Sequence, residues 1–153
     1  ATALAQQIAV FDSSRVLPLM PQHQQAEQEL KNISQRLHNE YTLMQNEFDT
    51  KYSDYQLLNA DPDTPATIRE RRIQEIRQAD QELQDFRKRS AETLAAERER
   101  LTQPVTDALN AAVAAVARQA GYSVVLDVAV TPVAYRADNT PDITLQIIDR
   151  LGL

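Results

Sequence analysis

The sequence predicts an α+β protein that is predominantly α: a long antiparallel helical hairpin, or coiled-coil arm, on a small β-containing oligomerisation body. The 153 residues include only two glycines, which argues against a β-rich protein with many tight turns. Gln, Ala, Glu, Arg and Leu are abundant and favour helices, whereas aromatic residues, at 5%, are too few for a large globular core. Apolar residues also recur at helical spacing on both sides of a proline-rich turn.

The first arm helix is predicted from Ala26 onward. Apolar residues follow one another there in steps of 4-3-4-4-3-4-4-3. The positions of this stripe are Ala26, Leu30, Ile33, Leu37, Tyr41, Met44, Phe48, Tyr52 and Tyr55. The steps make an 11-residue period of about 3.67 residues per turn, so we expect a seam that is nearly straight or coils slightly to the right.

A turn at residues 59–65 separates the two arm helices, because two prolines, two aspartates and an asparagine occur together there. Thr64 is expected as the N-cap and Pro65 at the first helical position. The second helix then begins at about Ala66 and repeats nearly the same period. Its stripe contains Ile68, Ile76, Ala79, Leu83, Leu94, Leu101, Val105, Leu109, Ala112, Val116 and Ala120. Matching periods on both sides of a short turn predict two antiparallel helices.

Pro104 interrupts the second helical pattern. A proline removes one backbone hydrogen bond and clashes with the carbonyl four residues earlier, so we expect a kink near Arg100 to Pro104. The sequence is highly charged before this point and Ala-rich after it. Pro104 is therefore the predicted hinge. The arm is expected to comprise residues 26–103, with its tip near 59–65, and the body residues 1–25 and 104–153.

Short β and helical segments are predicted at both ends. Ile8–Phe11 is expected as a strand, followed by a short helix through Met20 that Asp12, Ser13 or Ser14 caps. Gly121 is expected to end the long helix. The segments expected after it are strands at Tyr122–Asp127 and around Val133–Arg136 and a final helix at Ile143–Leu151, capped from within residues 140–142.

These end segments are too small to bury a core alone, and an isolated two-helix hairpin is weak. We therefore expect self-association, in which strands from several copies complete a shared sheet. The candidate residues are the apolar members of the two surest strands: Ile8, Val10, Phe11, Val124, Val125 and Leu126.

Composition argues against several classes of function. The net charge of −6 is unsuited to dedicated nucleic-acid binding, and no run approaches the ~18 apolar residues that span a membrane. The two histidines, His23 and His38, occupy polar helical positions, there is no cysteine, and two glycines do not make a phosphate-binding loop. We expect no enzyme activity, no cofactor and no metal.

Two kinds of arm residue are candidates for binding. Basic clusters at Arg69–Arg72 and Arg87–Arg89 either pair with neighbours such as Glu75 and Asp85 or form a positive patch. Apolar residues beside the seam, together with its tyrosines, either widen the seam or present weak contacts to a partner. The candidate contacts are Tyr41, Leu43, Tyr52, Tyr55, Leu57, Ile73 and Phe86.

The order of these features resembles the Skp/OmpH family of periplasmic chaperones over nearly the whole chain. Five motifs carry the resemblance: residues 8–13 (IAVFDS), 16–21 (VLPLMP), 103–105 (QPV), 121–127 (GYSVVLD) and 142–144 (DIT). The resemblance implies a homotrimer whose β-containing body carries three arms around a cavity. It also implies a holdase that binds unfolded outer-membrane proteins without ATP.

The resemblance implies export to the periplasm as well. Ala3-Leu4-Ala5 before Gln6 fits the small-x-small pattern of signal-peptide cleavage, which leaves Gln6 as the expected mature start. One departure is the acidic charge of this chain, since the best-known members are strongly basic. No lipopolysaccharide site carries over, because no motif matches residue by residue. The rival interpretation is a structural coiled-coil spacer or adaptor of the cell envelope.

Overall fold

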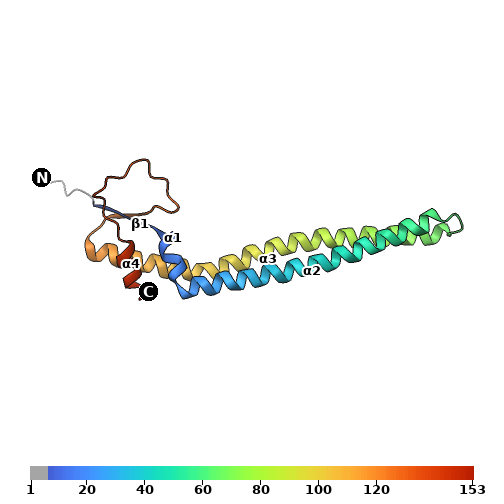
Figure 1. The fold of residues 1–153 in the computed structure, drawn as a ribbon, viewed down its shortest axis with the longest axis horizontal. Helices are drawn as coiled ribbons and strands as arrows, with labels where there is room; N and C mark the ends of the chain where they lie inside the picture. The colour runs from blue at the N-terminus through green and yellow to red at the C-terminus, as the bar shows by residue number, and fades with distance from the viewer. Residues whose placement is uncertain (1–6) are drawn as a thin grey trace. The chain divides into compact units, whose positions relative to one another are not determined.

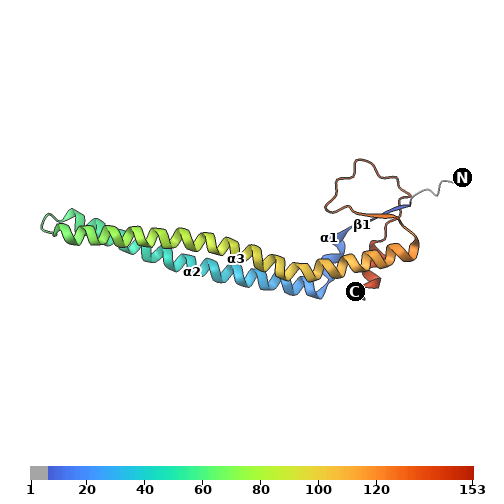
Figure 2. The same ribbon diagram turned by 180° about the vertical axis from the view of Figure 1, so that it is seen from behind.

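The computed structural model describes residues 7–153 (Figure 1, Figure 2). The expected cleavage after Ala5 lies outside these residues. The described elements, in chain order, are β1 (Ile8–Phe11), α1 (Ser13–Val16), the 3-10 helix η1 (Leu17–Leu19), α2 (Pro21–Ala60), α3 (Ala66–Ala120), β2 (Val124–Asp127) and α4 (Thr144–Arg150). This order confirms the predicted class, which is predominantly α with a small sheet.

The chain divides into two compact units. The body unit contains the described residues up to Gln28 together with Glu99–Leu153, and the arm unit contains Glu29–Arg98. Both views show α2 and α3 side by side along the arm unit (Figure 1, Figure 2). The predicted antiparallel hairpin is thus confirmed.

The arm seam is only partly shielded from solvent. Leu30, Ala79 and Leu83 are buried, but most stripe residues of α2 are half-buried and Tyr52 is exposed. Two helices leave the outer side of their seam uncovered, so this gradation follows from the architecture. Glutamine side chains add hydrogen bonds along the exposed surface, for example from Gln45 to Asp49 at 3.0 Å.

Phe86 corrects the predicted seam of α3. Its side chain is 9% exposed and continues the buried row from Leu83, and Ser90 follows at the next seam position, half-buried. The steps from Leu83 through Phe86 and Ser90 to Leu94 are 3-4-4, which matches the period of α2. The sequence interpretation placed Phe86 beside the seam because a serine at position 90 concealed the repeat.

The arm tip at 61–65 is closed by local hydrogen bonds. The backbone N–H of Asp63 donates to Oδ1 of Asp61 at 2.9 Å, and the N–H of Thr64 donates to the Asp61 carbonyl at 3.2 Å. The first helical bond of α3 runs from the Arg69 N–H to the Pro65 carbonyl at 3.3 Å. Pro65 therefore takes the N-cap position, and the prediction of Thr64 there was wrong by one residue.

Helix α3 continues without interruption through Pro104, which lies on an exposed turn within the body unit. The helix is therefore not broken at Pro104, and the role of this residue as a hinge stays a prediction. Gly121 ends α3 with a positive φ of 79°, and the N–H of Tyr122 donates to the Ala117 carbonyl at 3.0 Å. This glycine termination confirms the sequence prediction, because the left-handed conformation is strained for residues with a Cβ.

The sheet of the body unit consists of β1 and β2, which run parallel from Ile8 opposite Val124 to Phe11 opposite Asp127. The predicted strand at 133–136 does not form, and this segment has no regular structure. The edge of β1 that faces away from β2 is bonded to residues 141–143. The Val10 N–H donates to the Pro141 carbonyl, and the Ile143 N–H donates to the Val10 carbonyl, both at 2.9 Å. Since both edges of β1 are occupied, 133–136 has no strand partner there.

One face of this sheet packs on the core. Ala9 and Phe11 contribute to a buried cluster with residues of α1, α3 and α4, and Val125 packs against it. The full buried cluster is Ala9, Phe11, Val16, Met20, Val105, Leu109, Ala112, Ile143 and Ile147. The burial of Val105, Leu109 and Ala112 fits the expectation that the Ala-rich part of α3 belongs to a packed region.

Candidate functional site

The apolar arm candidates divide into three classes of exposure. Leu43 and Leu57 are 65% and 73% exposed, and Tyr52 is also exposed. Tyr41, Tyr55 and Ile73 are half-buried, and Phe86 is buried. Leu43 and Leu57 are therefore the candidates that the packing of the chain leaves most exposed.

Leu43 and Leu57 share one side of α2. They are separated by two intervals of seven residues, with Thr50 between them, so all three lie on nearly the same face of the helix. A shallow hollow of about 370 Å³ adjoins Leu43 and is lined by Asn46, Glu47, Thr50 and Lys51 as well. The exposed leucines therefore lie in a mixed polar surface rather than in one continuous apolar patch.

A second hollow, here called the seam hollow, opens between α2 and α3 in the arm unit. Its volume is about 310 Å³, and its lining residues are Ser34, Leu37, His38, Tyr41, Phe86, Arg87, Ser90, Ala91 and Leu94. It brings together two sequence candidates, Tyr41 and Phe86. The sequence prediction did not include Ser90 and Ala91. Their small side chains, together with that of Ser34 on the other helix, leave space in the seam that larger side chains would fill.

The basic clusters of the arm are partly neutralised. Arg72 forms an ion pair with Glu75, with Nη1 and Oε2 2.8 Å apart, and Nη2 of Arg69 donates to the Asp61 carbonyl at 3.3 Å. Asp85 accepts a hydrogen bond from Gln81 at 2.9 Å and, within the described residues, forms no ion pair. The predicted pairing is therefore correct for Glu75 and wrong for Asp85.

The oligomerisation candidates divide between the two faces of the body sheet: Phe11 and Val125 lie on the core face, and the others lie on the second face. Ile8 and Val124 are cross-strand neighbours and are 47% and 42% exposed, while Val125 and Leu126 are half-buried. Val10 and Phe11 are 3% and 5% exposed. These two side chains are already packed within one chain, so they are not free to bind another copy.

A hollow of about 460 Å³ lies beside this sheet face. Exposed Tyr135 and Val133 of the irregular segment line it together with Ile8 and Leu126. Val133 and Tyr135 therefore extend the surface that the strands begin. This extended surface, comprising Ile8, Val124, Leu126, Val133 and Tyr135, is called the sheet face below.

A polar cluster fixes the start of α4 beside the end of β1. The carboxylate of Asp142 accepts hydrogen bonds from the Thr144 N–H at 3.0 Å and from the Thr144 hydroxyl at 2.6 Å. It also pairs with Arg136, with Nη2 and Oδ2 3.2 Å apart. Burial alone would raise the pKa of Asp142, but the bonds from Thr144 and the Arg136 guanidinium outweigh it and hold the pKa below its usual value.

The comparison with known families decides the classification. The family model described as outer membrane protein (OmpH-like) matches residues 7–151. The chain belongs to the OmpH-like family. The resemblance found in the sequence motifs is thereby confirmed.

One solved relative supports the OmpH-like fold. It is a crystal structure from Caulobacter crescentus CB15 of an OmpH-like protein proposed to be an outer membrane chaperone. The two share 18% sequence identity with a TM-score of 0.73, over 99% of this chain and 86% of that chain. At this identity the likeness shows the fold alone. No curated protein matches the sequence.

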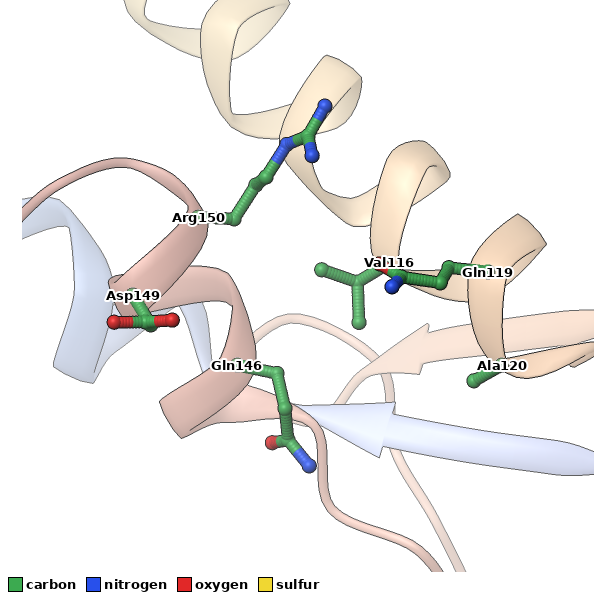
Figure 3. Close-up of a pocket in the computed structure, with 6 residues that line it drawn as sticks. All are labelled: Val116, Gln119, Ala120, Gln146, Asp149 and Arg150. Atoms are coloured by element: carbon green, nitrogen blue, oxygen red, sulfur yellow. The ribbon is translucent and has the colours of Figure 1, made fainter.

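The body unit of this OmpH-like chain has a further hollow of about 380 Å³ between the end of α3 and α4. Figure 3 shows Val116 pointing from α3 into the space between the two helices and the Arg150 side chain extending toward α3. Gln119, Ala120, Gln146 and Asp149 complete the lining. None of the sequence-predicted site residues lies here.

The described residues of the OmpH-like chain hold no group of three or more side chains suited to bind a metal ion. Within residues 7–153, no helix is both long and apolar enough to cross a membrane.

Proposed function

We propose that this OmpH-like protein is an ATP-independent holdase that binds unfolded outer-membrane proteins in the periplasm and prevents their aggregation. The observation that carries the proposal is the distribution of exposed apolar side chains along the arm, with Leu43, Tyr52 and Leu57 accessible on one helix. Family membership supports the same role, since the Caulobacter relative is itself proposed to be an outer membrane chaperone.

Weak and repeated contacts are the proposed mechanism of holding. Each exposed leucine or tyrosine contributes only a part of the roughly 1.5–3 kcal/mol that full burial of a large apolar side chain provides. Several such contacts on linked arms raise the effective concentration of binding sites, so an unfolded chain is retained although each contact breaks readily. Release then needs no nucleotide, because folding of the client into its membrane removes the bound surface.

A homotrimer is proposed as the working assembly. The sheet face supports this assignment, because Ile8 and Val124, which pair at the start of the two strands, both expose apolar surface. Packing this face against other copies would bury that surface and complete the core that the short strands leave open. Pro104 is proposed as the point at which α3 bends to fit clients of different size.

The rival interpretation is a structural spacer or adaptor that joins fixed partners. The two differ in selectivity: a spacer binds one partner to saturation, whereas a holdase binds many unrelated unfolded chains. The underfilled and partly exposed arm seam favours the holdase, since a rigid spacer gains stability from a filled seam.

The proposal is tested by diluting several unrelated unfolded β-barrel proteins from denaturant into buffer without ATP and recording light scattering. Stoichiometric trimer is expected to suppress aggregation of all of them. Absence of suppression for every β-barrel protein would exclude the holdase function. Fractionation of cells producing the full-length precursor tests the location, with recovery in the periplasmic fraction as the expected result.

A further inference from the structure

We propose that the seam hollow of the arm unit is a subsite for one apolar side chain of an unfolded chain, preferentially an aromatic residue next to a carboxylate residue. The inference rests on the proposed holdase function and names the chemistry that this part of the arm selects. Its basis is the size, the lining and the charge of the hollow.

The volume of the seam hollow fits a single side chain. An apolar cavity of about 150 Å³ already binds benzene, so about 310 Å³ accommodates one aromatic ring and adjoining backbone atoms. The same volume is too small for a helix or a paired strand. An extended, unfolded segment can therefore insert one residue there while its backbone stays outside the hollow.

The lining is suited to an aromatic ring. Leu37 and Tyr41 of α2 and Phe86 and Leu94 of α3 supply the apolar walls. Phe86 is almost fully buried, so it is held by its own packing before any ligand arrives. Aromatic rings in such a setting favour another ring in stacked or edge-to-face contact.

Ser90 is the residue that keeps the hollow open. It occupies the seam position four residues after Phe86 and four before Leu94, where the apolar repeat calls for a large side chain. Its hydroxyl oxygen is buried and has no hydrogen-bond partner within the described residues. A small residue with an unsatisfied polar group lowers the stability of the hairpin, and such departures from an otherwise consistent pattern are typical of functional sites.

The charge at the rim of the hollow is positive. Among the described residues that line the hollow, Arg87 carries a positive charge and none carries a carboxylate. The hollow beside Leu43 differs, because Glu47 and Lys51 both line it. Charge complementarity therefore favours a carboxylate next to the inserted side chain at the seam hollow.

The test compares wild-type full-length protein with Ser90→Leu, using dye-labelled unfolded peptides of equal length whose single large apolar residue is Phe. Leucine at position 90 fills the hollow and replaces the unsatisfied hydroxyl. We expect the melting temperature to rise or stay unchanged, while the affinity for a peptide containing Phe-Asp falls about tenfold, as expected for loss of one buried ring. An unchanged affinity in the folded variant would overturn the proposal.

Two controls distinguish binding at the subsite from nonspecific hydrophobic binding elsewhere on the arm. Ser53→Leu adds the same side chain to an exposed position of α2 and should not lower the affinity for the Phe-Asp peptide. Arg87→Gln should abolish the preference of the wild type for Phe-Asp over Phe-Lys peptides, whereas the neighbouring Lys88→Gln should retain most of it. Wild-type protein that shows no preference between these peptides contradicts the proposed charge selectivity.

A crosslinking measurement on wild-type protein does not depend on whether any variant folds. A peptide with a photoreactive phenylalanine analogue is expected to attach to residues that line the seam hollow, such as Leu37 or Leu94. Attachment confined to other surfaces would overturn the proposal. Aggregation assays in parallel distinguish failure of the subsite from failure of the holdase function. Suppression of aggregation without crosslinks in the hollow would support the holdase function and contradict the subsite. Specific crosslinks without suppression would support the subsite and contradict the holdase function.

Discussion

The backbone N–H of Asp12 donates a hydrogen bond to the side-chain hydroxyl of Thr144 at 3.1 Å, across 132 positions of sequence. Thr144 is 1% exposed and uses the same hydroxyl to donate to Asp142 at 2.6 Å. This single oxygen therefore joins the end of β1 to the start of α4. Two segments far apart in the sequence are thus held together by a partly buried polar contact.

Replacing Thr144 by valine should destabilise the body by about 1–3 kcal/mol, because the Asp12 N–H loses its acceptor where water has little access. Urea unfolding followed by circular dichroism measures the effect. Thr144→Ser retains the hydroxyl and serves as the matched control, with a smaller loss. Equal stability of the valine variant and the wild type would show that the contact carries no net energy.

Asp142 gives the body a predictable dependence on pH. Its pKa is lower in the folded chain than its ordinary value of 3.8, so the folded state favours the ionised carboxylate. This contribution to stability is fully present above the ordinary pKa and is lost as the pH falls through the lower folded pKa. Urea unfolding between pH 7 and pH 3 should show the decline at the acid end, and Asp142→Asn should reduce its slope there.

Leu43 and Leu57 should act in binding and not in folding. Their joint replacement by serine is expected to leave the unfolding free energy within about 0.5 kcal/mol of wild type, since both side chains are mostly exposed. Suppression of aggregation should then require several-fold more protein. Gln25→Ser and Gln35→Ser, at exposed α2 positions that line none of the hollows described, provide a matched surface control. Undiminished activity of the leucine double variant would mean that another surface binds clients.

Phe86, in contrast to the two exposed leucines, should contribute mainly to the stability of the arm. Truncation to alanine removes a buried ring from the arm seam and is expected to cost about 3–5 kcal/mol in the unfolding free energy. Thermal unfolding of Phe86→Ala beside Leu57→Ala makes the comparison direct, because both changes remove a large apolar side chain. A loss below 1 kcal/mol would be inconsistent with the seam position that the structure gives to Phe86.

The sheet face should control assembly. Ile8→Asp combined with Val124→Asp places two like charges on neighbouring strands where another copy is proposed to pack, and each would need costly desolvation there. Light scattering should report a shift from trimer mass toward monomer mass. Val130→Asp, at an exposed position of the irregular segment, is the control expected to leave the mass unchanged. A wild-type protein that is monomeric at micromolar concentration would contradict the proposed trimer.

Local chemistry made much of this fold predictable. The repeat from Ala26 to Tyr55, the turn ended by Pro65 and the stop at Gly121 each depend on a few neighbouring residues, so periodicity and backbone preferences identify them. The strand predicted at 133–136 failed for a complementary reason. Strand formation depends on pairing with a distant segment, and residues 141–143, rather than 133–136, bond to the second edge of β1.

The exposure of the candidate binding residues was only half predictable for a related reason. The sequence correctly indicated Leu43 and Leu57 as surplus apolar residues, but it did not distinguish them from Phe86, which the second helix buries. The seam hollow depends on small residues of two helices meeting at the same level, notably Ser34 and Ser90. The spacing of residues within one helix does not show which residues of the other helix lie opposite them.

The sequence by itself determined the helical hairpin, its period and its ends, because those features arise from interactions between residues a few positions apart. Only the tertiary structure decided which apolar residues are covered, which segment occupies the second edge of β1 and where the arm seam stays open. Those properties depend on contacts between segments far apart in the chain, such as Asp12 with Thr144. Their energies follow from burial and partner geometry, which the order of residues does not contain.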